Sequence, residues 1–135
     1  MELFSWKNDY SVKVGSIDSD HQKLFDIINS LFTAMSKGEG RQVISGLVKE
    51  LQSYTIYHFN REETFFRVTS YPNAANHLEQ HKIFVSKVKE YKEKIDKGNN
   101  NFSPEMLTYL KDWLLNHILV TDKAYSDHFT KNGIL

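Results

Sequence analysis

Histidine is unusually frequent in this chain, which contains six histidines and no cysteine among its 135 residues. His58 and Glu62 are four residues apart, and so are His77 and His81. On a helix this spacing places two side chains on one face, so each pair can reach a single site. Imidazole and carboxylate donors without a thiolate suit iron, zinc, copper or nickel. The spacing therefore indicates a metal site built on helices.

Three stretches rich in Gly, Pro and Asn divide the chain into long segments. These stretches are SKGEG (36–40), TSYPN (69–73) and KGNNNFSPE (97–105). We expect helices over about 18–37, 41–68, 73–97 and 104–121, with an irregular arm over about 1–16 and a further C-terminal segment. Short connections make neighbouring helices antiparallel. The chain is therefore predicted to form one all-α domain over 1–135, an up-down-up-down antiparallel four-helix bundle.

The ends of the predicted segments carry capping residues. We expect Asp18 or Ser16 to cap the first helix and Ser103 to cap the last one. The arm contains Trp6, Tyr10 and Val12, which can lie against the bundle.

Within each segment, residues at spacings of three and four form one face, and that face includes histidines. The predicted stripes are Leu47, Leu51, Tyr54, His58, Glu62 and Phe65; His77, His81, Phe84, Val88, Tyr91 and Ile95; His21, Leu24, Ile28, Leu31 and Met35; and Leu107, Leu110, Leu114, His117 and Thr121. A single core histidine usually only hydrogen-bonds a carbonyl group. A buried glutamate is costly unless it is paired or binds metal. Because every stripe carries such a residue, a metal site explains the pattern better than unrelated histidines do.

The number of candidate ligands indicates two metal ions. With Asp122 added, the candidates are His21, His58, Glu62, His77, His81, His117 and Asp122. A tetrahedral zinc takes four ligands and an octahedral metal takes six. If both carboxylates and a solvent oxygen bridge two octahedral ions, all but one of the coordination positions are filled. The remaining position would accept one small ligand.

The order H…HxxxE…HxxxH…HxxxxD resembles the hemerythrin family in its bacterial single-domain form. The flanking stretches IDSDHQKLF (17–25), HFNREE (58–63), YPNAANHLEQH (71–81) and WLLNHILVTDKAY (113–125) agree, and so does FSW near the N-terminus. Bacterial members often have Leu-Met and one residue more after the HFxxEE stretch, where this chain has Phe65 and Phe66. This difference concerns the shape of the pocket or ligand access rather than metal binding.

The resemblance implies a non-haem di-iron site that binds dioxygen reversibly. His77, His81 and His117 would bind one iron, whereas His21 and His58 would bind the other, which keeps the open position. Glu62 and Asp122 would bridge the two ions together with an oxo or hydroxo group. Residues that match the family's oxygen pocket, although ordinary core packing also explains them, are Phe59, Trp113, Leu114 and Ile118. Tyr125 matches a tyrosine near the site in relatives, with a half-buried bundle aromatic as the alternative.

Two further residues stand apart from the regular pattern. Asp122 follows His117 by five residues, which leaves the two about 140° out of phase on an α-helix. For Asp122 to reach the site, the helix must contain a π-type turn or end near Thr121. We therefore predict a local irregularity at residues 118–122. His128 lies outside the motif, and we expect it to be exposed, structural or idle.

The residue pattern leaves other functions to be weighed. A di-iron oxidase or a ferritin-like iron store uses more carboxylates and Glu-x-x-His pairs. No histidine here has Glu three residues before it. We therefore expect a binding protein and not an enzyme, with a weak peroxidase-like side activity or nitric oxide handling as alternatives. A sensor module that signals through a protein partner is a further alternative.

The overall composition excludes several partners. The formal net charge is zero, so nothing in the charge balance favours nucleic acid. The N-terminus lacks the basic start and apolar block of a secretory signal. No apolar run approaches the roughly 18 residues that a membrane span needs. A cytoplasmic protein is the expectation.

Overall fold

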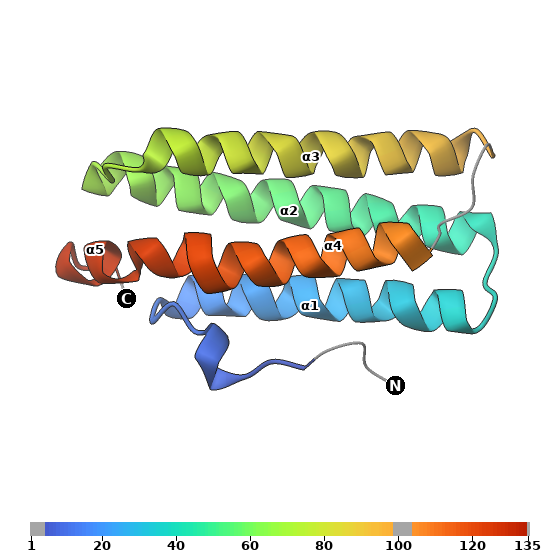
Figure 1. Cartoon of the computed structure of the whole chain (residues 1–135), viewed down its shortest axis with the longest axis horizontal. Coiled ribbons are helices and arrows are strands. Elements are labelled where there is room, and N and C mark those ends of the chain that lie inside the picture. The colour runs from blue at the N-terminus through green and yellow to red at the C-terminus, as the bar shows by residue number, and fades with distance from the viewer. Residues whose placement is uncertain (1–4, 99–103, 135) are drawn as a thin grey trace.

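The computed structural model describes residues 5–98 and 104–134, which form four long helices packed side by side (Figure 1). The long helices are α1 (Gly15–Ser36), α2 (Arg41–Thr69), α3 (Ala74–Asp96) and α4 (Pro104–Asn116). The shorter elements are η1 (Asn8–Tyr10), a π-helical segment η2 (His117–Asp122), a 3-10 segment η3 (Lys123–Tyr125) and α5 (Ser126–Lys131). Consecutive long helices run in opposite directions, which confirms the predicted up-down-up-down all-α bundle (Figure 1).

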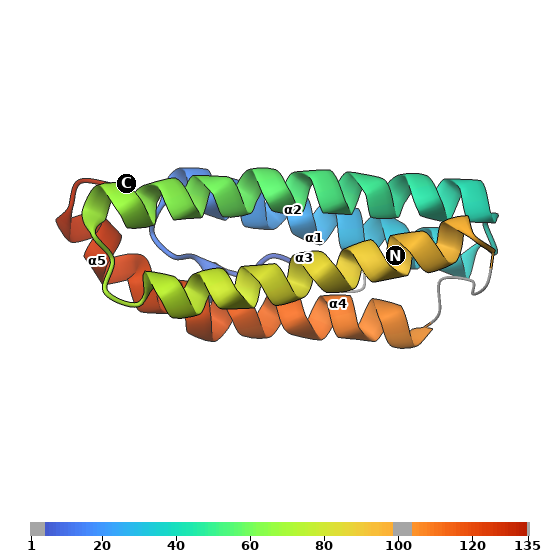
Figure 2. The ribbon, with the colours of Figure 1, turned by 90° about the horizontal axis from the view of Figure 1, so that it is seen from above.

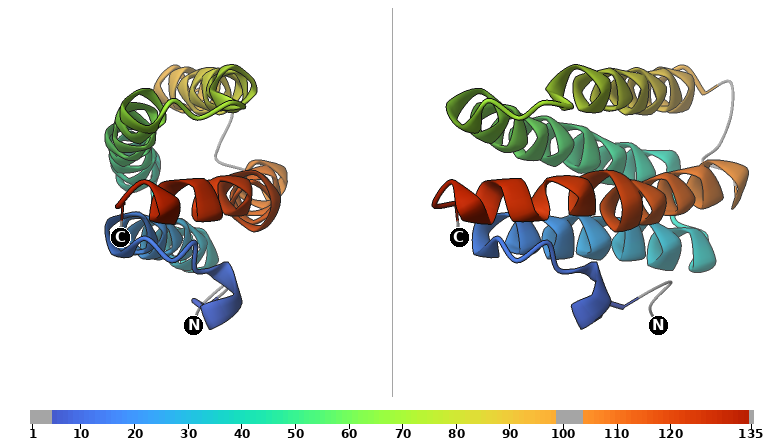
Figure 3. Two further views of the ribbon diagram at one scale, coloured as in Figure 1. Left: turned by 90° about the vertical axis from the view of Figure 1, so that its left-hand side faces the viewer. Right: turned by 60° about the vertical axis from the view of Figure 1, so that its left-hand side comes forward.

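The end of the bundle at which α1 begins also holds the connection between α2 and α3 and the short helix α5 (Figures 1 and 2). Seen along the bundle, the four long helices surround a common interior, and the N-terminal arm lies outside α1 (Figure 3). Side chains from all four helices therefore meet in one core.

The first helix begins at Gly15, three residues before the predicted start, and no side chain caps it. The prediction that Asp18 or Ser16 caps this helix is wrong. Asp18 lies in the first turn and accepts hydrogen bonds from the Ser11 hydroxyl group at 2.5 Å and the Val12 amide at 2.9 Å. Its carboxylate therefore attaches the arm to α1. The predicted cap Ser103 lies outside the described residues.

Left-handed residues follow each of the long helices α1, α2 and α3. Gly38 and Gly98, which follow α1 and α3, both have φ of +69°. Glycine adopts this conformation without a Cβ clash, which explains its place there. Ser70 ends α2 with φ of +55°, and the Tyr71 amide then donates to the Phe66 carbonyl oxygen at 3.0 Å.

Two apolar clusters fill the interior. The main apolar cluster consists of buried side chains from the long helices and η2: Leu24, Phe25, Ile27, Ile28, Leu31, Ala34, Ile44, Val48, Leu51, Phe59, Phe84, Val88, Tyr91, Ile95, Met106, Leu107, Leu110, Leu114 and Ile118. The end cluster consists of Val12, Val14, Ile17, Phe66, Tyr71, Tyr125 and Phe129. Trp6 and Tyr10 of the arm pack against the main apolar cluster. Val12 belongs to the end cluster, so the prediction that these three arm residues can lie against the bundle is confirmed.

The buried stripe of α2 differs in part from the prediction. Leu51, His58 and Glu62 are buried as expected, but Leu47, Tyr54 and Phe65 are only partly buried. Their places are taken by Ile44, Val48, Thr55 and Phe66. The helix contacts α1 on one side and α3 on the other, so its buried face is wider than a single line of residues. None of the helices in the described ranges is long and apolar enough to cross a membrane.

Candidate metal centre

All seven candidate ligands lie together between the two apolar clusters. They come from α1 (His21), α2 (His58 and Glu62), α3 (His77 and His81) and η2 (His117 and Asp122). Each is at most 2% exposed to solvent. We call these seven residues the polar layer. The turns of helix that carry them continue directly from the apolar stripes, so the same packing that forms the core brings the donors together.

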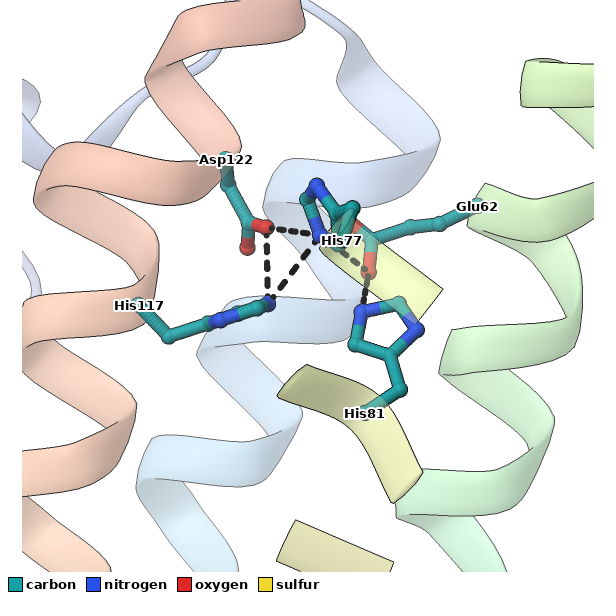
Figure 4. A group of neighbouring side chains, drawn as sticks. All are labelled: Glu62, His77, His81, His117 and Asp122. Atoms are coloured by element: carbon teal, nitrogen blue, oxygen red, sulfur yellow. Dashed lines mark hydrogen bonds and ion pairs between the residues drawn. The ribbon is translucent and has the colours of Figure 1, made fainter. Parts of the chain in front are cut away.

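One part of the polar layer contains three histidines (Figure 4). Asp122 Oδ1 lies 2.9 Å from His77 Nε2 and 3.0 Å from His117 Nε2. Glu62 Oε1 lies 3.2 Å from His81 Nε2. One donor atom from each of these five residues lies within 4.8 Å of all the others. We call this the three-histidine group.

The other part contains two histidines. His21 Nε2 lies 3.0 Å from Asp122 Oδ2, and His58 Nε2 lies 3.2 Å from Glu62 Oε1. The donor atoms of these four residues also lie within 4.8 Å of one another. This two-histidine group shares both carboxylates with the three-histidine group. The geometry therefore offers two adjacent metal positions with Glu62 and Asp122 between them.

Unpartnered polar atoms test whether this layer fits metal ions. The nitrogen–oxygen distances are short, yet many of the atoms take part in no hydrogen bond. Such an atom, buried without a partner, is destabilising by about 1–3 kcal/mol. A cation between the converging lone pairs would remove that cost, so the layer fits metal ions. The atoms without partners are both ring nitrogens of His21, Nε2 of His58 and His81, Oε1 of Glu62 and both carboxylate oxygens of Asp122.

The irregular segment η2 accounts for the position of Asp122. A π-helix spans His117–Asp122, one residue wider than the predicted irregularity, and a 3-10 segment follows it. A wider helical turn brings residues five apart onto the same face. Asp122 is consequently fully buried and points into the layer with His117 (Figure 4). The prediction of a local irregularity is confirmed.

The charges of the layer depend strongly on one another. Burial opposes ionisation of Glu62, and Asp122 opposes it further, but attraction to His58 holds the pKa of Glu62 below its usual range. Burial also opposes ionisation of Asp122, yet His117 holds that pKa well below its usual range. For His58, burial lowers the pKa, but Glu62 and Asp20 outweigh burial and raise it to about 10. A metal ion would replace the protons on such imidazoles, because metal ligands must be deprotonated.

Three residues outside the polar layer accept hydrogen bonds from its histidines. Their oxygens lie 2.9–3.1 Å from an imidazole Nδ1. The pairs are His58 with Asp20, His81 with Glu63 and His117 with Gln80. An acceptor at Nδ1 requires the proton on that nitrogen and leaves Nε2 free to bind metal. The sequence analysis missed these three residues. The signal that could have found them is adjacency, because each stands next to a candidate ligand in the chain.

Tyr125 is fully buried, and its hydroxyl group donates to Glu62 Oε2. Burial raises the pKa of Tyr125 well above its usual value, and the nearby Asp122 and Glu62 raise it further. The alternative of a half-buried bundle aromatic is therefore wrong. A protonated phenol at this position holds the second oxygen of Glu62.

Aromatic side chains pack directly on the imidazoles. Phe59 stacks on His81 with the ring centroids 3.6 Å apart, and Trp113 stacks on His117 at 4.3 Å. Leu114 and Ile118, at 3% and 0% exposure, belong to the main apolar cluster. All four residues expected to line an oxygen pocket therefore lie in or against the core beside the polar layer.

Phe66 and His128 lie on the side of the layer that faces the end cluster. The Phe66 ring lies 4.7 Å from His77, while Phe65 packs against Phe129. The two phenylalanines that depart from the bacterial pattern therefore border the end cluster. His128 is half-buried and lies outside the polar layer, and its Nε2 contacts the Thr69 carbonyl oxygen at 2.8 Å. This contact attaches α5 to the end of α2, which is a structural role.

The helical bundle and its buried layer of metal-ligating side chains place this chain in the class of helical cation-binding proteins. Residues 12–128 match the family model described as Hemerythrin HHE cation binding domain, so the chain belongs to the hemerythrin family. It is 32% identical over 127 residues to a bacteriohemerythrin of Stenotrophomonas maltophilia (strain R551-3), covering 94% of this chain and 82% of the relative. It is 30% identical over 124 residues to Myohemerythrin-1 of Phascolopsis gouldii, covering 92% of each chain.

The comparison of folds agrees with the family. A crystal structure of wild-type hemerythrin has a TM-score of 0.90 and 28% identity to this chain. The match covers 95% of this chain and 98% of that one. Hemerythrins are oxygen-binding proteins rather than enzymes, and their site is a non-haem di-iron site.

Proposed function

We propose that this chain binds dioxygen reversibly at a di-iron site held by the polar layer. The observation that carries the proposal is the convergence of seven buried donor side chains, several of them without a hydrogen-bond partner, in a chain of the hemerythrin family. His77, His81 and His117 would hold one ion and His21 and His58 the other, with Glu62 and Asp122 between them. When bound, the two iron ions would supply the electrons and the open coordination position that a dioxygen ligand requires, and an oxo or hydroxo group would accompany them.

The chain itself contributes orientation and exclusion of water. Asp20, Glu63 and Gln80 lie at the Nδ1 atoms of three imidazoles and favour the tautomer that binds metal. Phe59 and Trp113 cover two imidazoles with apolar rings. An apolar surround limits solvent access to a metal site, which favours reversible binding over side reactions. We include Phe59, Trp113, Leu114 and Ile118 as the oxygen pocket in this proposal.

The acidic residues around the layer favour binding over turnover. Both of its carboxylates face imidazoles of the two groups. Asp20 and Glu63, which contact imidazoles from outside the layer, each lie at hydrogen-bond distance from Nδ1. A carboxylate that acts as a general base must be free to accept a proton, and these four are engaged with imidazoles. Oxygen transport and a cytoplasmic location form the finer part of the proposal.

Metal analysis and optical spectra of the reduced protein before and after exposure to air test this function. The proposal predicts about two iron ions per chain, in keeping with the two groups of donors. It also predicts a visible charge-transfer band that forms in air and disappears on removal of oxygen. A single zinc ion per chain, or a spectrum that does not change reversibly, would contradict the proposal.

A further inference from the structure

The two metal positions differ in the support that their histidines receive. In the three-histidine group, His81 Nδ1 lies 3.1 Å from Glu63 Oε2, and His117 Nδ1 lies 3.1 Å from Gln80 Oε1. In the two-histidine group, His58 Nδ1 lies 2.9 Å from Asp20 Oδ2, whereas His21 Nδ1 has no hydrogen-bond partner among the described residues. Within the part of the chain that the structure describes, Asp20 is therefore the sole support at Nδ1 in that group.

Asp20 is built into the interior as a charged group. It is 2% exposed and lies on α1, next to the ligand His21. Two donors from α2 hold it: the Tyr54 hydroxyl group donates to Oδ1 at 3.0 Å, and Arg61 Nε donates to Oδ2 at 2.8 Å. A buried carboxylate with a cationic donor and a hydroxyl donor remains ionised. His58 thus has an ionised carboxylate at the ring nitrogen that faces away from the site.

An ionised acceptor changes how well an imidazole binds a cation. It holds the proton on Nδ1, fixes the orientation of the ring and makes Nε2 a stronger donor. This strengthening matters more where two histidines share a metal than where three do. Arg61 acts in the opposite direction, because its positive charge lies on the same carboxylate oxygen and repels a metal cation.

From this asymmetry we infer that Asp20 is a positioning residue that sets the metal affinity of the two-histidine position, and that Arg61 moderates its effect. The inference rests on the two-metal site proposed above. Its consequence is that the two metal ions are lost separately when Asp20 is changed, with the ion between His21 and His58 lost first.

The test uses the full chain freed of metal and titrated with cobalt(II) against a competing chelator. Asp20→Asn keeps the size of the side chain and an acceptor oxygen but removes the charge. Changes in such outer groups typically lower metal affinity by about 10–100-fold. We expect one of the two cobalt ions to bind about 10–100-fold more weakly and the other to bind as in the unchanged protein. Anomalous scattering from cobalt-loaded crystals should show lower occupancy between His21 and His58.

Arg61→Gln separates an electrostatic role from a merely structural one. Its side chain is 30% exposed, so the substitution is compatible with folding even if Asp20→Asn is not. The Tyr54 hydroxyl group still donates to Asp20 in this variant. Without the positive charge of Arg61, cobalt(II) should therefore bind the two-histidine position more tightly, and unchanged binding would overturn the moderating role of Arg61. A structural role for the Asp20–Arg61 pair predicts weaker binding instead, and that result would overturn the inference.

Two matched acid-to-amide changes serve as controls. Glu63 accepts the hydrogen bond from His81, and its side chain is 34% exposed. Glu63→Gln should leave the affinity of the two-histidine position unchanged. Asp26→Asn changes an exposed residue of α1 and should change neither affinity. Equal weakening of both ions, or of neither, in Asp20→Asn would overturn the role of Asp20. Failure of the unchanged protein to bind two ions would count against the di-metal site itself.

Discussion

The main apolar cluster and the polar layer are built by the same helices and are equally buried, but they differ in what completes them. Leu31 and Leu51 are fully buried in the apolar cluster, where they pack against other apolar side chains. Glu62 and Asp122 are also fully buried, but atoms of both lack hydrogen-bond partners. Burial stabilises the first region directly, whereas it stabilises the second only when a cation is present. The difference shows that the main apolar cluster stabilises the fold, whereas the polar layer is suited to binding a cation.

The largest effect should come from removing a shared carboxylate charge. Glu62→Gln or Asp122→Asn leaves an amide that neither neutralises nor bridges two cations, so we expect iron to fall from about two ions per chain to one or fewer. Metal analysis after loading with ferrous iron measures this. His128→Ala, outside the polar layer, is the control and should retain full occupancy. Equal iron content in all three variants would contradict the assignment of the bridges.

A change in the main apolar cluster should affect folding and not metal content. Leu51 is fully buried, so Leu51→Ala should lower the free energy of unfolding by about 2–5 kcal/mol through lost burial and a cavity. Because Leu51 lies outside the polar layer, the loss should be similar with and without metal. Denaturant unfolding of both forms measures it.

Leu47→Ala is the matched control for Leu51→Ala. Leu47 is only partly buried on the same helix and should cost less. Equal costs at positions 47 and 51 would favour the stripe expected from the sequence over the observed one. A cost for Leu51→Ala that appears only in the metal-loaded form would remove the distinction between the two regions.

Tyr125→Phe should have an intermediate effect, because Tyr125 belongs to the end cluster but its hydroxyl group reaches the polar layer. The substitution leaves Glu62 Oε2 without its donor. An unsatisfied buried acceptor costs about 1–3 kcal/mol. We expect a loss of this size in thermal or denaturant unfolding, with two ions still bound. An unchanged stability would mean that the hydroxyl group contributes nothing to the layer.

The smallest effect should come from the edge of the layer. The Thr121 hydroxyl group donates to Gln80 Oε1 at 2.9 Å, and the same oxygen lies beside His117 Nδ1. Thr121→Val removes one partly buried hydrogen bond, worth about 0.5–1.5 kcal/mol, and leaves Gln80 on His117. Unfolding should detect the small loss, while metal content stays the same. A fall in metal content would mean that Thr121 helps to hold Gln80 in place.

Local spacing predicted much of the fold and the site. The stripe from His77 to Ile95 is buried as expected, because on a regular helix the spacing of residues decides which of them share a face. The predicted start of α1 was wrong, because Asp18 forms hydrogen bonds with the arm instead of capping the helix. The stripe on α2 was partly wrong, because contacts with two neighbouring helices widen the buried face.

By itself, the sequence determined the helical segments and six of the candidate donors, because these depend on residue type and on spacing along one helix. Asp122 is out of phase with that spacing; it was identified through the resemblance to the hemerythrin family, and it required an irregular turn before it. Only the tertiary structure decided which groups support the histidines. Asp20 on α1 serves His58 on α2, Glu63 on α2 serves His81 on α3, and Gln80 on α3 serves His117 in η2. Each of these pairs joins two different elements, so its geometry depends on how the helices pack, which residue spacing along a single helix cannot specify.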